Sequence, residues 1–104
     1  MILIHSIIEV VDNNNQGYYD GISPLIDKIK SMDGCVDFQL AQHANESMDY
    51  IDIKFIKDDF VHVVQKWQSL EHYNRYLLSD IKSQLRDAVH PIIKEFKQYV
   101  LDVS

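Results

Sequence analysis

Two apolar segments followed by a helix, within residues 34–79, most constrain the fold of this chain. The first segment begins after Gly34 and alternates apolar with polar residues, which predicts a strand with one buried face. The second segment, Phe60–Trp67, predicts another strand, and Ser69 then stands where a helix N-cap is expected. The order in this stretch is therefore strand, strand, helix.

The segments on either side extend this order into an α+β pattern. Runs of β-branched and aromatic residues predict strands, and apolar residues at three- and four-residue steps predict helices. We expect strands at Ile2–Val11, Cys35–Gln42, Phe60–Trp67 and Phe96–Val103, and helices at Tyr18–Met32, after a cap at Ser69, and after a cap at Ser79 or Asp80.

Two of three further details of the expected elements stay open to alternatives. Pro24 either kinks the first helix or marks a new helix start capped by Ser23. Gly34 is placed to end that helix in the left-handed conformation. The alternating segment Asp49–Phe55 predicts a short edge strand or a strand extension.

The predicted order, β-α-β-β-α-α-β, is that of a ferredoxin-like, split βαβ sheet with helices on one face. A chain of 104 residues is expected to form a single domain, here residues 1–104. Helices on one side leave the other face of the sheet bare. An apolar face of that size needs a partner, so we expect a homodimer in which two sheets face each other.

Composition excludes several functional classes. The net charge of −6 argues against nucleic-acid binding, which depends on basic patches. No run of about 20 apolar residues is present, so no membrane association is expected. The N-terminal segment lacks a basic region and is interrupted by Glu9, which favours a strand over a signal peptide. The single Cys35 predicts a reducing, cytoplasmic location.

The end of the second segment carries a motif, Trp67-x-Ser69-x-Glu71, with Tyr73 two residues further on. In this motif and in its strand–strand–helix order the chain resembles the antibiotic biosynthesis monooxygenase family of small dimeric α/β-barrel proteins. The resemblance implies a dimeric α/β barrel. It also implies an oxidoreductase activity without cofactor, in which an electron-rich aromatic or quinone-like ring reacts with dioxygen.

The chain departs from the family pattern at three positions. Val63 stands where an Asn is placed before the Trp, Gln65 where a Glu is common, and Tyr76 where many members carry a His. Haem-degrading relatives carry an axial His near the place of Arg86. These relatives also carry a Trp where this chain has Tyr76, so haem breakdown is not expected. His90, one helical turn beyond Arg86, leaves haem binding open.

The resemblance and these departures define the candidate site. We expect Tyr73 and Arg86 to be catalytic, with no cofactor, and a small aromatic ligand to contact Trp67, Tyr76, Val63 and Gln65. An arginine side chain would favour the reactive anion of a phenol. For Trp67, simple packing in the core is the alternative to ligand contact.

The histidines do not show the spacing of a metal-binding motif, so no metal site is expected. His5 and His62 lie on predicted strands and could share one polar spot. The second hypothesis for the chain is a non-catalytic ligand-binding or interaction module on the same scaffold. A void lined by Trp67, Tyr73, Tyr76 and Arg86 would favour an enzyme, whereas a filled core would favour the module.

Overall fold

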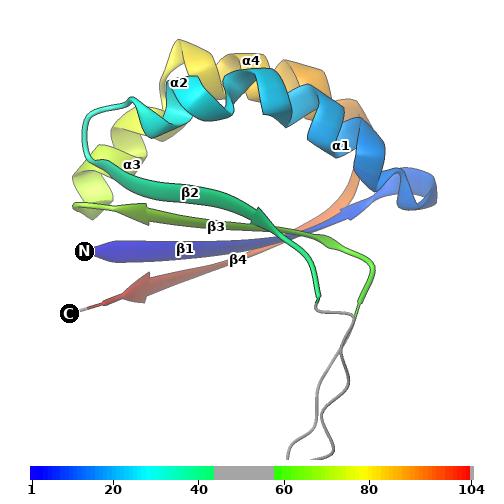
Figure 1. Ribbon diagram of the computed structural model, residues 1–104, viewed down its shortest axis with the longest axis horizontal. Helices are drawn as coiled ribbons and strands as arrows, with labels where there is room; N and C mark the ends of the chain where they lie inside the picture. Colours follow the sequence, from blue (N-terminus) through cyan, green and yellow to red (C-terminus); the bar gives the residue numbers. More distant parts are fainter. Residues whose placement is uncertain (44–57, 104) are drawn as a thin grey trace, which may run out of the picture.

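A four-stranded antiparallel sheet covered on one face by helices makes up the computed structural model, which describes residues 1–43 and 58–103 (Figure 1). This is the expected ferredoxin-like α+β fold. No helix within those ranges is long and apolar enough to cross a membrane. The strands are β1 (Ile2–Val10), β2 (Cys35–Ala41), β3 (Val61–Trp67) and β4 (Ile93–Asp102), and the helices are α1 (Asn15–Ile22), α2 (Ile26–Lys30), α3 (Leu70–Leu77) and α4 (Asp80–Val89).

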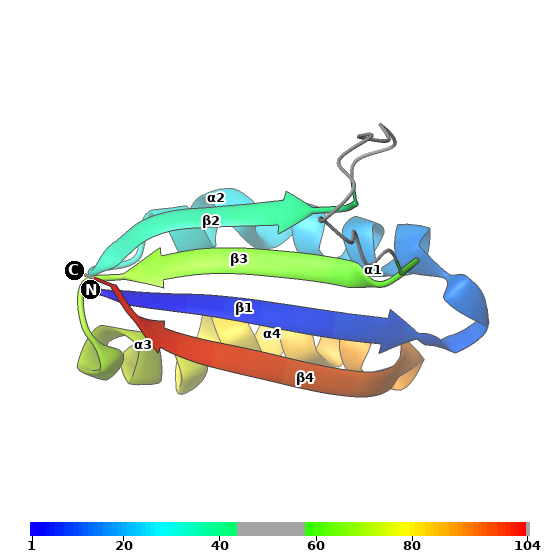
Figure 2. The same cartoon turned by 90° about the horizontal axis from the view of Figure 1, so that it is seen from below.

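The strand order is β2-β3-β1-β4, so that β1 and β3 form the centre of the sheet (Figure 2). Burial alternates along β1: Ile4, Ser6 and Ile8 are buried beneath the helices, whereas His5 and Ile7 are half-buried. The strand register extends this alternation across the sheet. On the covered face Ile4 pairs with Gln65 and Val100, and on the opposite face His5 pairs with Val64 and Tyr99. One face of the sheet therefore builds the core and the other lies open.

Side-chain caps set the starts of three helices. Ser69 accepts a hydrogen bond from the backbone N–H of His72, and Ser79 accepts one from Lys82, both at 3.2 Å. The expected cap at Ser69 is thus confirmed, and Ser79 rather than Asp80 caps α4. Asn14 accepts from the Gly17 N–H at 3.1 Å. This cap starts α1 at Asn15, three residues before the predicted start.

The segment around Pro24 resolves the alternatives for the first helix. A 3-10 turn, Ser23–Leu25, separates α1 from α2, so the chain is interrupted at the proline. The Ser23 hydroxyl donates to the Tyr19 carbonyl at 2.6 Å and caps no new helix. Gly34 follows with φ of +84°, the left-handed conformation expected of it.

The last strand is longer than predicted. A 3-10 turn containing Pro91, His90–Ile92, ends the helical region, and β4 begins directly after it at Ile93 rather than at Phe96. Pairing of Ile93 with Val10 across the sheet provides the additional length. The strand predicted at Asp49–Phe55 lies outside the described residues.

The core lies between the sheet and the helices, and Trp67 is its largest fully buried side chain. The Trp67 ring stacks on Tyr76 of α3, with 5.1 Å between centroids and an interplanar angle of 21°. Tyr73 lies 6.0 Å away in a tilted arrangement. Trp67 thus packs at the junction between β3 and α3, as the packing alternative proposed.

Replacing Trp67 with Ala is expected to lower the free energy of unfolding by about 3–5 kcal/mol, because a fully buried ring would leave a cavity. Urea denaturation at fixed protein concentration measures this change. Leu78→Ala, at a side chain that is 89% exposed, is the control and should change stability by less than about 0.5 kcal/mol. A Trp67→Ala midpoint equal to that of the control would contradict this role.

Candidate functional site

A cavity of about 230 Å³ lies between the helices and the sheet. Its walls come from all four strands and from α1, α3 and α4, and they are mostly apolar, as is usual for small-molecule sites. The lining residues are Ser6, Ile8, Tyr18, Phe38, Val63, Gln65, Tyr73, Tyr76, Leu77, Lys82, Leu85, Phe96 and Gln98.

A second cavity of about 250 Å³ adjoins the first along α4. The two share the side chains of Ile8, Tyr18, Lys82, Leu85 and Phe96. The second cavity adds to these Arg86, Val89, His90 and Ile93.

Hydrogen bonds hold the polar groups of the first cavity in place. The Gln98 amide nitrogen donates to the Tyr73 hydroxyl at 2.7 Å and to the Ser6 hydroxyl at 3.3 Å. The Trp67 indole N–H donates to the Gln65 carbonyl oxygen at 2.9 Å. Tyr73 and Gln65 are therefore oriented before any ligand enters, which reduces the entropic cost of binding.

Burial is the main cause of the pKa shifts of the titratable groups in the site. Desolvation raises the pKa of Tyr18, of Tyr73 and of Tyr76, so these phenols remain protonated at neutral pH. Desolvation, followed by the nearby charge of Arg86, lowers the pKa of Lys82. The Lys82 ammonium nitrogen lies 5.6 Å from the centroid of the Tyr76 ring, within cation–π range.

The structure places most of the expected site residues around the first cavity. Tyr73, Tyr76, Val63 and Gln65 line it, whereas Arg86 is exposed and lines only the second cavity. Trp67 is not among the lining residues of either.

Several lining residues were missed by sequence reasoning. Lys82 lies one helical turn before Arg86 on α4 and borders both cavities, a position that helical spacing alone could have indicated. Gln98 enters the site through its pairing with Ser6, which requires the register of β4 on β1. His90, the residue considered for haem, is exposed at the wall of the second cavity.

No family model and no curated protein matches this chain. Solved structures do match over nearly the whole length. A "Putative antibiotic biosynthesis monooxygenase from Nitrosomonas europaea" superposes with a TM-score of 0.78 at 12% identity, covering 99% of this chain and 98% of that one. A structure of the same description from Caulobacter crescentus gives 0.78 at 16% identity, covering 99% and 89%.

A third match is to a protein from Bacteroides thetaiotaomicron described as of unknown function and a "Possible Oxidoreductase". Its TM-score is 0.75 at 13% identity, covering 98% of this chain and 96% of that one. The chain thus has the fold of structures described as antibiotic biosynthesis monooxygenases. At these identities the likeness concerns the fold, which is the fold that the sequence motif implied.

Stability should fall as the pH rises above about 10, the ordinary pKa of tyrosine. The buried phenols keep their protons when folded but lose them when unfolded, so rising pH favours the unfolded state until the folded pKa is passed. Each such tyrosine contributes at most about 1.4 kcal/mol per pH unit. Urea denaturation of Tyr76→Phe should show a shallower decline than the wild-type protein, with Tyr19→Phe, at a partly exposed side chain of α1, as control. Identical slopes in wild type and Tyr76→Phe would contradict the assignment.

Proposed function

We propose that this chain acts as a cofactor-independent monooxygenase on a small aromatic or quinone-like molecule bound in the first cavity. The observation that carries the proposal is an apolar cavity in which the tyrosines Tyr18, Tyr73 and Tyr76 meet the amine of Lys82. Flat apolar walls suit an aromatic ring, and the few polar groups suit its oxygen atoms. The names of the matching structures support the same class of reaction.

In this reaction a phenolic ring first loses a proton to solvent water and becomes electron-rich enough to react with dioxygen. One oxygen atom enters the ring as a carbonyl, and the other leaves as water after the ring has given up two electrons and two protons. Positive charge beside the ring favours its phenolate form. Lys82 borders the ring-sized cavity and Arg86 the adjoining one, so both contribute to this charge, while Tyr73 donates a hydrogen bond to the ring oxygen.

A non-catalytic ligand-binding module is the second candidate. It is favoured by the chemistry of the walls: among the described residues, no Asp or Glu lines either cavity. The described residues therefore supply no carboxylate base at the ring. Val63, at the place of the family's Asn, adds only apolar surface.

Oxygen consumption with anthrones and quinols separates the two candidates. For an enzyme, Lys82→Met should lower turnover more than Arg86→Met, because Lys82 borders both cavities, and Tyr76→Phe should change turnover least. A loss of about tenfold or more is expected for Lys82→Met, equivalent to about 1.4 kcal/mol of transition-state stabilisation. Saturable binding without oxygen uptake by the wild-type protein would favour the module.

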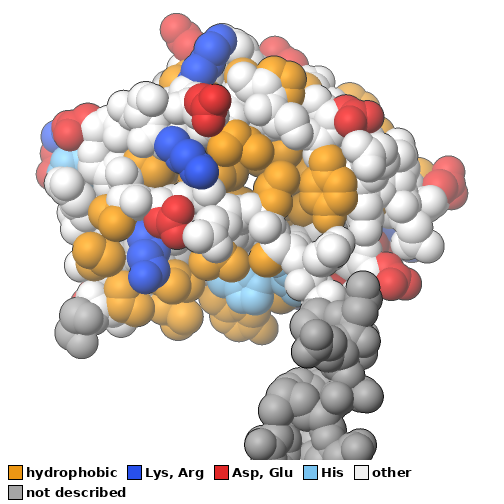
Figure 3. Space-filling model, viewed as in Figure 1, with side chains coloured by type: hydrophobic (Ala, Val, Ile, Leu, Met, Phe, Trp, Pro, Cys, Tyr) orange, Lys and Arg blue, Asp and Glu red, His pale blue; other side chains and the backbone are white. Residues whose placement is uncertain are grey.

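We also propose a homodimer that covers the open face of the sheet. Apolar side chains lie on that face beside polar ones, among them Leu3 and Ile7 of β1 and Leu101 and Tyr99 of β4. Tyr99 and Leu101 are 55% and 49% exposed. Figure 3 shows hydrophobic side chains on the lower, helix-free side of the molecule, next to histidines.

Light scattering at micromolar concentration should give twice the 12.2 kDa mass of one chain. Leu101→Lys on the open face should shift the protein toward monomer, because it would place a charge in an apolar contact. Lys28→Glu, at an exposed side chain of α2 on the helical side of the molecule, changes the charge away from the open face and serves as control. A wild-type mass near 12.2 kDa across the range would contradict the proposal.

A further inference from the structure

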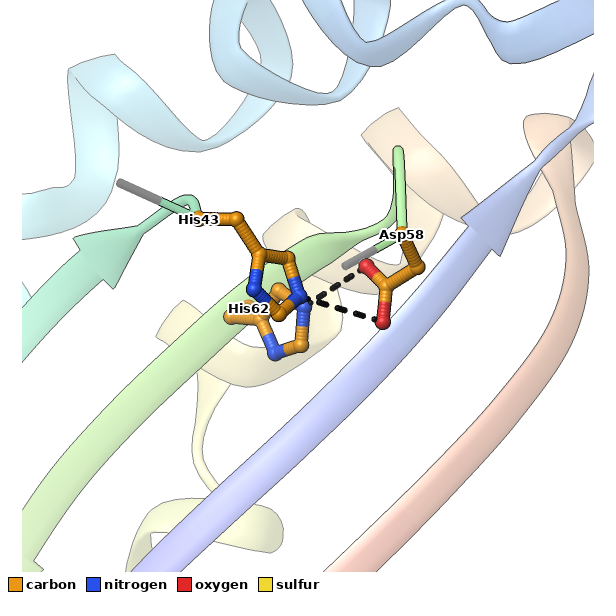
Figure 4. Close-up of side chains that lie close together, drawn as sticks. All are labelled: His43, Asp58 and His62. Carbon is orange, nitrogen blue, oxygen red and sulfur yellow. Dashed lines mark hydrogen bonds and ion pairs between the residues drawn. The ribbon is translucent and has the colours of Figure 1, made fainter. Parts of the chain in front are cut away.

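We propose that His43, Asp58 and His62 form a binding site for a divalent transition-metal ion of the zinc class. The three side chains lie together at the edge of the open sheet face (Figure 4). His43 follows the end of β2, and Asp58 and His62 flank the start of β3. The register explains the meeting, because Ala41 pairs with His62 across the sheet and brings His43 beside it.

The ligand atoms already have nearly the separations that a metal ion requires. The Asp58 carboxylate lies 2.9 Å from His62 Nε2 and 3.3 Å from His43 Nε2, and one ligand atom of each residue lies within 4.8 Å of the others. Tetrahedral ligands at the usual zinc distances of about 2.0–2.1 Å stand about 3.3 Å apart. Small side-chain rotations would thus enclose an ion.

Both ring nitrogens that face the cluster point at the same carboxylate. His43 Nε2 is buried and forms an ion pair with Asp58 Oδ2 at 3.3 Å, and His62 Nε2 lies 2.9 Å from Asp58 Oδ1 (Figure 4). An ion placed between the three side chains would therefore meet two imidazole nitrogens and a carboxylate. The Asp58 carboxylate is held in place by the Phe60 backbone N–H, which donates to Oδ1 at 2.9 Å, and by His62 Nε2 at the same distance.

A supporting residue is in place behind His62. His5 Nε2 lies 2.9 Å from His62 Nδ1. When His62 Nε2 binds a metal, its ring proton sits on Nδ1 and is donated to His5, the arrangement that orients histidine ligands in metal sites.

The chemistry of the ligands selects the kind of ion. Two imidazoles and one carboxylate suit zinc and its neighbours among the transition metals, whereas magnesium and calcium prefer oxygen ligands. A shallow depression lined by His5, Gln42, His43 and Val64 gives access to the cluster, so water can occupy a fourth position. The site lies on the opposite face of the sheet from the cavities.

Calorimetric titration of the metal-free protein with Zn²⁺ alone should give one ion per chain, and Co²⁺ should produce a visible absorption band from imidazole and carboxylate ligands. His43→Ala and Asp58→Asn should each weaken Zn²⁺ binding more than about 100-fold, beyond the 10–100-fold typical of supporting residues. Both alter partly exposed side chains, so folding is expected to persist and circular dichroism checks it. Mg²⁺ should not compete.

His5 tests the supporting role separately. His5→Leu should weaken Zn²⁺ binding about 10–100-fold, whereas His5→Gln, whose carbonyl can accept the same bond, should restore most of the affinity. His90→Ala, at an exposed imidazole outside the cluster, should bind as the wild type does. Zn²⁺ affinity and Co²⁺ absorption that stay unchanged in His43→Ala and Asp58→Asn would overturn the proposal, as would a wild-type protein that binds Zn²⁺ no more tightly than these variants.

Discussion

The stack of Trp67 on Tyr76 is the contact on which the rest of the molecule depends. It joins the last residue of β3 to α3, across the boundary between the sheet and the helices. Trp67 also fixes Gln65 through its indole N–H, and Tyr76 lines the first cavity. The same contact therefore holds the two layers together and forms one wall of the candidate site. A rigid wall of this kind favours a ligand site that is formed before the ligand arrives.

The second constraint is that every helix in the described part of the chain lies on one face of the sheet. The covered face then holds the core and the cavities, while the open face holds apolar side chains and the cluster of His43, Asp58 and His62. The two faces offer different chemistry: neutral phenols and an amine on one, imidazoles and a carboxylate on the other. Ligand binding in the cavity and metal binding on the open face can thus be examined by separate substitutions.

Local patterns in the sequence were sufficient for the element order, the fold class and the cap at Ser69, because these depend on residues close together in the chain. The early start of α1 was not predicted, because its cap, Asn14, lies within a polar run that is equally typical of a turn. The site was harder to predict. Tyr73 and Tyr76 lie on one helix, so their spacing in the sequence places them together. Gln98 contacts Tyr73 only because of the register of β4 on β1, and His43 lies beside His62 only because of the register of β2 on β3. Spacing along the chain does not contain that information.

Binding of a flat aromatic molecule in the first cavity is the central claim, and the fluorescence of the single tryptophan reports on it directly, because Trp67 stacks on a residue of the cavity wall. Titration with anthrone, without dioxygen, should change the Trp67 emission saturably in the wild-type protein. Ser6→Leu fills the cavity from β1, so it should abolish this change while the protein remains folded. An equal response in the wild type and in Ser6→Leu, or no response in the wild type, would contradict the account.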